Sequence, residues 1–285
     1  MNILNQKKKN LIVFTDLDGT LLDHDTYSFN EARPALDRLR QLDVPVIPST
    51  SKTFSEVEIL LRDLNMMSPV IVENGSVIAV PATEEFSHYQ PQYQMGDFNV
   101  THLSVDYPFV INSLVDFRNK FGFKFRGFND MNVAEIAKIT GLTIENSANA
   151  KKRMCSEPLI WTDSDRNFDL FKQTLKNHHL RIIQGGRFWH VMGEASKSDA
   201  MKNIVDIYQR NVGQKLTVIA LGDNANDVSM LKSADIGVII RRKDRSCLSF
   251  ESNNQIYTSN LSGPAGWNAF FMHFLDNDLN DSNKT

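Results

Sequence analysis

The feature that most constrains the fold is a repeated alternation between short apolar runs and amphipathic helical stretches. The first run, Leu11–Phe14, is apolar and rich in β-branched residues, which is typical of a buried strand. Four further segments follow in order: a helical pattern at 30–43, an apolar run at Val44–Ile47, a helix that opens at Thr53, and an apolar run at Val70–Val72. Strands and helices that alternate at this spacing predict a parallel sheet with helical crossovers.

The alternation stops after about Val80 and returns near residue 195. Residues 81–106 are rich in Pro, Gln, Tyr and His without a clear period, and a mixture of helical and strand-like stretches follows them. An amphipathic helix then leads to the apolar run Leu216–Leu221 and to a further run at Ile236–Ile240. We therefore predict an α/β fold, in which a doubly wound parallel sheet is interrupted by an inserted α+β cap domain.

The expected domain boundaries follow this change of pattern. Residues 1–82 and 193–285 form the predicted core, and residues 83–192 form the predicted cap. A chain of 285 residues is long for one domain and sufficient for two. With 41% hydrophobic and 23% charged residues, its composition is ordinary for a globular protein that buries a core.

Charge and cysteine content bound the partners and the compartment. The net charge of −3 does not favour nucleic acid or an anionic membrane, so we expect neither partner. No apolar stretch approaches the length of a membrane span. Cys155 and Cys247 are too few for a disulfide framework, which indicates reduced thiols and a cytoplasmic location. The oligomeric state is left open.

The first predicted strand is followed directly by the segment Asp16-Leu17-Asp18-Gly19-Thr20. Ligands of open α/β sheets bind at this end of the strands. We predict that Asp16 is a nucleophile that attacks phosphorus and forms an aspartyl-phosphate. Asp18 is then the general acid that protonates the departing oxygen and later accepts a proton from water. The alternative is an ordinary turn rich in Asp and Gly.

The run Leu216–Leu221 is likewise followed by an oxygen-rich segment, Gly222–Asp227, with the sequence GDNAND. Mg²⁺ takes few protein carboxylates and keeps water and substrate oxygens as its other ligands. The predicted Mg²⁺ ligands are Asp16, the backbone carbonyl of Asp18, and Asp223. Asn226 and Asp227 are expected to bind the cation through water molecules or to contact the residues that bind it. Taken alone, GDNAND is also compatible with a plain loop and helix cap.

Two further residues are expected to contact the phosphate. Thr50 follows the second predicted strand, and its hydroxyl can donate to a phosphoryl oxygen near the N-terminus of the next helix. Thr53 and Glu56 have capping-box spacing in that helix, and Ser51 fits either role. Lys197 begins the helix that re-enters the core, where its charge opposes the helix dipole unless an anion compensates it. We predict that Lys197 neutralises transition-state charge, the alternative being an exposed surface lysine.

These four elements, in this order, resemble the haloacid dehalogenase superfamily of phosphatases: DLDGT, the strand-end Thr50, Lys197 and GDNAND. The large insertion before the lysine helix is similar to the cap of the Cof-like, C2 branch of that superfamily. The resemblance implies a Rossmann-like core, a requirement for Mg²⁺, and nucleophilic catalysis by the first aspartate of the first motif, which is Asp16.

A narrower resemblance is to the mannosyl-3-phosphoglycerate phosphatase family. It rests on the segments DLDGTLLDHDTYSF, STSKT, IVENG, SEPL, GGRFWHVMGEASK and GDNANDVSML, of which GGRFWHVMG and TSKT are the more discriminating. The resemblance implies hydrolysis of mannosyl-3-phosphoglycerate to mannosylglycerate. Pro48 stands where a small or aliphatic residue is expected, and proline suits strand ends and sheet edges.

A glycosyl phosphoglycerate carries a carboxylate as well as a phosphate, and an arginine can bind a carboxylate through two hydrogen bonds. Arg187 is the candidate for this contact in the cap. The candidates for contacts with sugar hydroxyls are His190, Glu157 and Arg153. Each of the four has an ordinary alternative, namely a surface arginine, a histidine at the edge of the core, or solvated charges.

The expected function is therefore that of a Mg²⁺-dependent phosphatase acting on mannosyl-3-phosphoglycerate. Two alternatives lie within the same superfamily: a phosphatase for glucosyl-3-phosphoglycerate or a hexose phosphate, and a phosphosugar mutase. A third alternative is a sugar-phosphate-binding regulator without catalysis. We rank the regulator low because both aspartates of the first motif and the aspartate of the metal motif are present.

Overall fold

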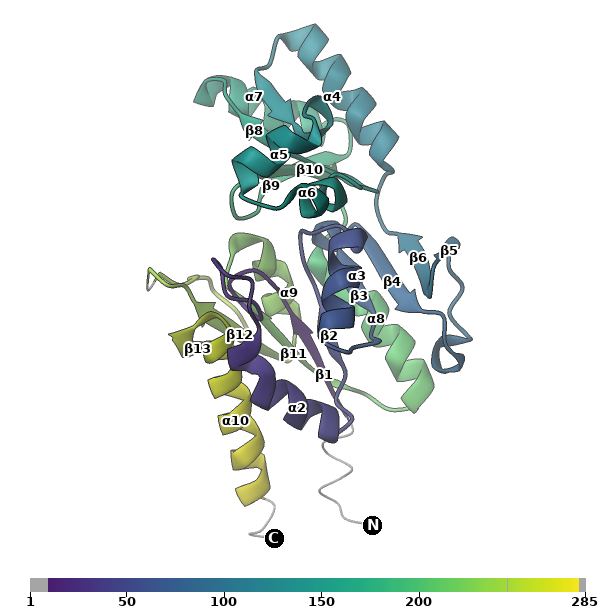
Figure 1. Ribbon diagram of the computed structural model, residues 1–285, viewed down its shortest axis with the longest axis vertical. Helices are drawn as coiled ribbons and strands as arrows, with labels where there is room; N and C mark the ends of the chain where they lie inside the picture. The colour runs from purple at the N-terminus through teal and green to yellow at the C-terminus, as the bar shows by residue number, and fades with distance from the viewer. Residues whose placement is uncertain (1–9, 245, 282–285) are drawn as a thin grey trace. The chain divides into compact units, whose positions relative to one another are not determined.

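The computed structural model describes residues 10–244 and 246–281 (Figure 1). Within them the chain divides into two compact units. The first unit holds the residues up to Thr50 and those from Met201 onward, and the second runs from Ser51 to Ala200. The domain boundaries drawn from the sequence pattern stay predictions.

A five-stranded parallel sheet forms the centre of the first unit. Its strands, in spatial order, are β13 (Gln255–Ser262), β12 (Ile236–Arg241), β11 (Thr217–Gly222), β1 (Leu11–Thr15) and β2 (Val46–Pro48). Every residue of β1 is buried, as expected for an inner strand of a parallel sheet. The predicted α/β class with a parallel sheet is confirmed.

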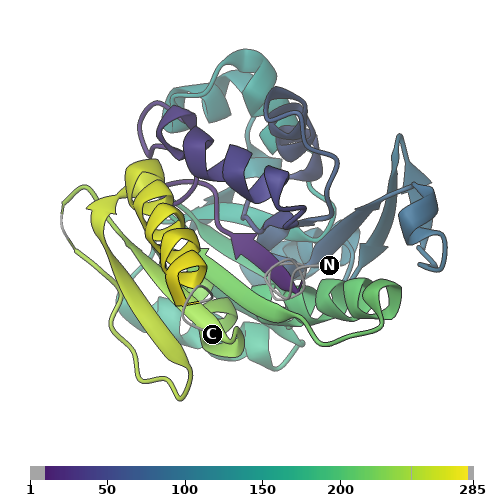
Figure 2. The same cartoon turned by 90° about the horizontal axis from the view of Figure 1, so that it is seen from below.

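Two helices lie side by side on this sheet, α10 (Gly263–Asp281) and α2 (Arg33–Gln41) (Figure 2). Trp267 and Phe271 of α10 are fully buried and their rings are in contact. The indole Nε1 of Trp267 donates to Thr15 Oγ1 at 3.1 Å. The C-terminal helix thereby anchors the last residue of β1, immediately before the first acidic motif.

Two other helices complete the first unit. The short helix α9 (Val228–Ser233) packs against β11 and β12. The longer helix α8 (Lys197–Val212) begins in the second unit and continues in the first, because the division between the units falls after Ala200. The one-turn 3-10 helices η1 (Asn30–Ala32) and η5 (Ala225–Asp227) lead into α2 and α9.

The second unit contains two four-stranded antiparallel sheets. The first sheet has the order β3 (Val70–Val72), β4 (Val77–Pro81), β6 (Phe98–His102) and β5 (Tyr93–Met95). The second has the order β7 (Phe125–Gly127), β8 (Ser156–Trp161), β10 (Trp189–Gly193) and β9 (Leu180–Gln184). Strands β5 and β6 arise in the region where the sequence shows no clear period.

The third predicted strand lies in a different sheet from the one expected. Val70–Val72 forms β3, but β3 pairs antiparallel with β4. The residues Glu73, Asn74 and Gly75 all have positive φ angles, of 50°, 58° and 96°, so the chain reverses and Val77 pairs with Val72. A tight reversal places the next strand antiparallel. The expectation that Val70–Val72 extends the parallel sheet is therefore wrong.

Helices cover the second of these sheets. α4 (Tyr107–Phe121) and α7 (Asp165–Lys176) pack on its strands. The buried core between them consists of Val110, Leu114, Phe117, Phe123, Phe125, Leu159, Phe171, Leu175, Leu180 and Val191. The helices α5 (Val133–Thr140) and α6 (Ile144–Ala150) pack on each other and contribute Ile136 and Ala150 to a smaller cluster.

The helix α3 (Phe54–Asp63) begins with the predicted capping box. The hydroxyl of Thr53 accepts a hydrogen bond from Glu56 N at 3.2 Å, and the Glu56 carboxylate accepts one from Thr53 N at 2.9 Å. Thr53 thus performs the capping role expected of it. Among the helices in the described part of the chain, none is both long and apolar enough to cross a membrane.

Candidate active site

Three buried aspartates meet at the carboxyl end of the parallel sheet. Asp16 follows β1, and Asp223 and Asp227 follow β11. Their exposed fractions are 6%, 6% and 0%, and one carboxylate oxygen from each lies within 4.8 Å of the others. The strand register brings them together, because Thr15 of β1 pairs with Leu221 of β11 and the Asp16 N–H donates to the Leu221 carbonyl at 2.9 Å.

Glycines allow the two acidic loops to approach each other. Gly19 has a φ of +85°, and a Cβ atom there would lie 3.0 Å from Asp223 Oδ2. At Gly222 a Cβ atom would lie 2.5 Å from the Cβ of Asp227. A larger residue at Gly222 would overlap Asp227, and one at Gly19 would crowd the Asp223 carboxylate and strain a left-handed backbone, so both positions favour glycine.

The loop of the second motif is held by its own side chains. The Asp227 carboxylate accepts hydrogen bonds from the N–H groups of Asp223 and Asn224, at 3.1 and 3.0 Å. Asp227 therefore caps its loop, as expected if GDNAND is a plain loop and helix cap. It also belongs to the acidic cluster, so the two interpretations of this segment are compatible. Thr20 of the first motif adds a bond to Asp223 Oδ1 at 3.3 Å.

The donor set of this cluster fits a hard divalent cation. Three carboxylates buried this close together repel one another, and burial disfavours their charged forms further. A bound cation such as Mg²⁺, which prefers oxygen ligands, offsets both effects. The predicted ligands Asp16 and Asp223 are both in the cluster. Asp227 is in the cluster as well, although it was expected only to bind the cation through water or to contact the residues that bind it.

Asp18 and Asn226 flank the cluster. Asp18 is partly buried, and its loop is closed by the Gly19 N–H, which donates to the Leu22 carbonyl at 2.9 Å. Asn226 lies in η5 between the two aspartates of the second motif and is also partly buried. The carboxylate of Asp18 is outside the cluster of three. This placement is compatible with the predicted use of its backbone carbonyl for the metal and of its carboxylate for proton transfer.

Thr50 lies at the same end of the sheet. It is 1% exposed and follows β2, which runs beside β1. The Ser49 N–H donates to the Thr15 carbonyl at 2.8 Å, so the chain continues along β1 up to Thr50. β2 is an outer strand of the sheet and Pro48 is its last residue, a position where the missing proline N–H is tolerated.

Lys197, the first residue of α8, is 1% exposed. Burial contradicts the alternative of an exposed surface lysine. The segment before it packs closely on the reversal after β3, because a Cβ atom on Gly75 would lie 2.2 Å from the Ser196 carbonyl and 2.5 Å from Lys197 N. The role of Lys197 in neutralising a phosphate stays a prediction.

Arg153 takes part in a buried network of the second unit. Its guanidinium lies 3.6 Å from the carboxylate of Glu73 and donates to the Ser51 carbonyl at 3.1 Å and to Ser156 Oγ at 2.6 Å. The same carboxylate accepts bonds from the N–H groups of Met154 and Cys155 and from the Ser156 hydroxyl. The contacts of Arg153 with the protein are therefore extensive, and its contact with a sugar stays a prediction.

Glu157 is 1% exposed, and burial raises the pKa of its carboxyl to about 7. Hydrogen bonds from the N–H of Asn129 at 2.7 Å and from the hydroxyl of Tyr107 at 2.8 Å oppose that shift, as does the charge of Arg153. A Cβ atom on Gly127 would lie 2.2 Å from the carboxylate, which shows how tightly the group is enclosed.

His190 and Arg187 differ in their surroundings. Burial lowers the pKa of His190 to about 3, assisted by the positive charges of Arg153 and Lys197, so the imidazole is neutral near pH 7. Arg187 is exposed, follows Gly185 and Gly186 in the connection between β9 and β10, and donates to the Thr140 carbonyl at 2.6 Å. Their contacts with substrate stay predictions.

Arg242 is a residue of this site that the sequence reasoning missed. Its Nε donates to the backbone carbonyl of Asp223 at 3.0 Å and lies 3.3 Å from Asp223 Oδ2, and its Nη2 donates to Asn224 Oδ1 at 2.8 Å. Arg242 directly follows β12. The signal that could have found it is its position, because the other site residues were found by looking for polar residues directly after a parallel strand, and the strand β12 was not examined in this way.

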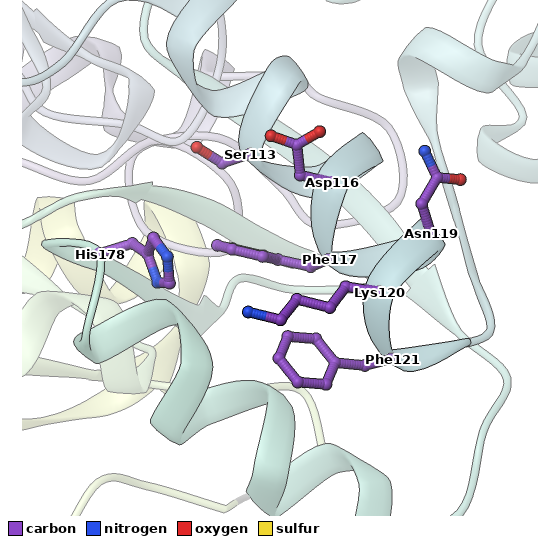
Figure 3. Close-up of a pocket in the computed structure, with 7 residues that line it drawn as sticks. All are labelled: Ser113, Asp116, Phe117, Asn119, Lys120, Phe121 and His178. Atoms are coloured by element: carbon purple, nitrogen blue, oxygen red, sulfur yellow. The ribbon is translucent and has the colours of Figure 1, made fainter.

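A hollow of about 500 Å³ lies elsewhere in the second unit (Figure 3). It is lined by Ser113, Asp116, Phe117, Asn119, Lys120, Phe121 and His178. Every lining residue except His178 belongs to α4, and Figure 3 shows the Phe117 side chain beside the imidazole of His178, with 4.6 Å between the centroids of the two rings. All seven lining residues lie outside the predicted site.

Comparison with known proteins places the chain in a family. A sequence model of the haloacid dehalogenase-like hydrolases matches residues 13–260. The glucosyl-3-phosphoglycerate/mannosyl-3-phosphoglycerate phosphatase of Methanococcoides burtonii is 35% identical over 269 residues, covering 94% of this chain and 98% of the relative. The enzyme of the same name from Persephonella marina is 33% identical over 269 residues, covering 93% and 97%.

The fold is shared with solved structures as well. The phosphatase BT1666 from Bacteroides thetaiotaomicron superposes with a TM-score of 0.62 at 18% identity, covering 93% of this chain and 94% of that one. With the acidic cluster at the strand ends and a family match over most of the sequence, the chain belongs to the haloacid dehalogenase-like hydrolases and is a phosphatase.

Proposed function

We propose that the protein is a Mg²⁺-dependent phosphatase that hydrolyses mannosyl-3-phosphoglycerate to mannosylglycerate and phosphate. The observation that carries this proposal is the buried cluster of Asp16, Asp223 and Asp227 at the carboxyl end of the parallel sheet. The names of the two curated relatives support the substrate class, since both include mannosyl-3-phosphoglycerate and its glucosyl analogue.

In the proposed reaction Asp16 acts as the nucleophile. Its carboxylate oxygen forms a bond to phosphorus while the bond from phosphorus to the leaving oxygen breaks, and Asp18 donates the proton that the leaving oxygen takes up. Asp18 then removes a proton from a water molecule that attacks the aspartyl-phosphate. The bond between phosphorus and Asp16 breaks, and inorganic phosphate is released.

The proposed cation ligands are Asp16, Asp223 and the backbone carbonyl of Asp18, with Asp227 and Asn226 supporting them. When bound, Mg²⁺ supplies positive charge that lets an anionic carboxylate approach an anionic phosphate. The Thr20 hydroxyl and the Asp227 side chain keep the Asp223 loop in place for this purpose.

Thr50 and Lys197 are proposed to hold the transferring phosphoryl group. Thr50 would donate a hydrogen bond to a phosphoryl oxygen, and Lys197 would neutralise charge that develops on it. The burial of both residues supports these roles, because a charge or hydroxyl removed from bulk water interacts more strongly with an anion. Arg187, His190, Glu157 and Arg153 remain the proposed contacts for the glycerate carboxylate and the sugar hydroxyls.

The test is a substrate panel with phosphate release as the readout. Mannosyl-3-phosphoglycerate is compared with glucosyl-3-phosphoglycerate, 3-phosphoglycerate and hexose phosphates, each after removal of divalent metal with EDTA and again after addition of Mg²⁺. We expect strong preference for the mannosyl compound, no turnover in EDTA, and recovery of turnover with Mg²⁺.

Each other outcome of the panel has a clear meaning. If the glucosyl compound is preferred, or hexose phosphates are turned over equally well, the proposed phosphatase reaction stands and the proposed substrate is wrong. Transfer of the phosphate to a second position of the sugar indicates a mutase. Turnover that survives full metal removal contradicts the metal site, and binding of sugar phosphates without any turnover indicates a regulator.

A further inference from the structure

Arg242 makes three contacts with the loop that carries the metal motif. The guanidinium bonds to the backbone carbonyl of Asp223 at 3.0 Å, to its carboxylate at 3.3 Å, and to the side-chain oxygen of Asn224 at 2.8 Å. Asp223 belongs to the acidic cluster. One side chain therefore fixes the main chain and the carboxylate of a proposed metal ligand at the same time.

The strand order explains why Arg242 reaches this loop. β12 runs parallel to β11, with Gly222 paired to Ile239, so the residues after β12 emerge beside the loop after β11. The preceding residue, Arg241, turns to the other neighbour of β12 and donates to the Ser259 carbonyl of β13 at 3.3 Å. Of these two consecutive arginines, Arg241 bonds to β13, and Arg242 bonds to the loop that follows β11.

The next residue, Lys243, extends the same connection to the first acidic motif. Its ammonium lies 2.8 Å from the Asp23 carboxylate and 2.6 Å from that of Asp25, both in the segment that follows Asp16. The hydrogen bond from Lys243 holds the pKa of the Asp23 carboxyl well below its usual range. Lys243 is half exposed, so this ion pair is screened and contributes less than the contacts of Arg242.

Arg242 has two opposing effects on a metal at Asp223. The guanidinium repels a cation, but it also holds the carboxylate that binds the cation. The side chain of Arg242 is 38% exposed, so water and salt weaken its repulsion. A carboxylate oxygen has two lone pairs, so an oxygen that accepts a hydrogen bond from Thr20 or Arg242 is still able to bind a metal.

We propose that Arg242 is a positioning residue for the metal site, holding the Asp223 carboxylate and its loop in the geometry that binds the cation. This inference rests on the proposed function, since it requires that the acidic cluster binds Mg²⁺. It differs from a purely structural role, because it predicts a change in metal affinity in a protein that is otherwise correctly folded.

The test is a metal titration of the full chain without substrate. Binding of Mn²⁺ is followed by the electron paramagnetic resonance signal of the free ion, and binding of Mg²⁺ by competition, for wild type, Arg242→Gln, Arg242→Lys and Arg62→Gln. We expect both Arg242 variants to bind metal about 10- to 100-fold more weakly, the range found for partners that orient metal ligands. Arg62→Gln is the control, because Arg62 is an exposed arginine of α3 that pairs with Glu58, and it should bind metal as the wild type does.

The outcomes separate the inference from the proposed function. Wild-type protein that binds no metal overturns the metal site itself. Metal binding by wild type together with equal or tighter binding by Arg242→Gln overturns the positioning role, because repulsion then dominates. Wild-type metal affinity in Arg242→Lys also overturns the positioning role, since a single positive charge would then be enough and the hydrogen bonds of the guanidinium would not be needed. Thermal melts verify folding, and if Arg242→Gln does not fold, the result for Arg242→Lys decides.

Discussion

The two units of the molecule bury their charges in opposite arrangements. In the first unit three buried carboxylates, those of Asp16, Asp223 and Asp227, gather at the end of a sheet, and the partly exposed Arg242 is paired with one of them. In the second unit the carboxylate of Glu73 has the guanidinium of Arg153 beside it and accepts three further hydrogen bonds.

The difference separates groups that bind a ligand from groups that hold the fold. Like charges that are buried together raise the free energy of the folded state until a cation binds to them. A buried charge with a partner and hydrogen bonds contributes to the fold, and removal of the partner leaves an uncompensated charge. Substitutions in the two clusters should therefore affect activity and stability in opposite ways.

The largest expected effect is on turnover, for Asp16→Asn. Loss of the nucleophile should reduce the rate of phosphate release by at least about 1000-fold. The free energy of unfolding in EDTA should stay the same or increase, because the amide removes one of three mutually repelling charges. Phosphate release and urea unfolding measure the two quantities. Turnover near the wild-type rate would rule out Asp16 as the nucleophile.

The second expected effect is on stability, for Arg153→Leu. Removing the guanidinium leaves Glu73 buried without its ionic partner, which should lower the free energy of unfolding by about 3 kcal/mol. Urea unfolding measures the loss, with Asp16→Asn as the control from the other cluster. The double variant Glu73→Gln/Arg153→Leu should recover part of it, as a double-mutant cycle would show. A loss below about 1 kcal/mol would contradict a role for this pair in the fold.

The smallest effect is a pH dependence of stability from Glu157. Its pKa is about 7 in the folded protein, against an ordinary value of 4.5, so the folded state holds the proton more tightly. Between these two values the free energy of unfolding falls as pH rises, by at most about 3 kcal/mol, and it levels off above pH 7.

The measurement compares wild type with Glu157→Gln by urea unfolding from pH 4.5 to pH 8. The comparison is needed because His190 has the opposite sign: its pKa of about 3 makes stability fall as pH drops below 6.5. Subtracting the variant isolates Glu157. Parallel curves for the two proteins would show that the carboxyl of Glu157 titrates normally.

Local pattern predicted much of this molecule correctly. The apolar runs before Asp16 and Gly222 are strands of one parallel sheet, and the capping box of Thr53 and Glu56 forms as expected. Asn74-Gly75 is a turn signal that ends the strand at Val72, but the antiparallel pairing of β3 with β4 was missed, because the left-handed conformations of Glu73 and Asn74 are accompanied by contacts far along the chain. One of these is the bond from the Met154 N–H to the Glu73 carboxylate.

The C-terminal elements β13 and α10 were not predicted either. Gly263, Pro264 and Gly266 suggest a turn when taken alone. In the structure Pro264 lies in the first turn of α10, where its missing N–H removes no helical hydrogen bond. Gly266 allows close packing, since a Cβ atom there would lie 2.2 Å from the Leu261 carbonyl.

The sequence by itself determined the chemical groups of the site and the strand ends that carry them, because strand periodicity and the Asp, Gly and Thr positions are properties of short segments. Only the tertiary structure decided that Asp227 joins Asp16 and Asp223, that Arg242 holds the Asp223 loop, and that Arg153 pairs with Glu73. Each of these depends on strand register and on contacts between residues distant in the chain, and no local pattern encodes which distant partner a buried charge will meet.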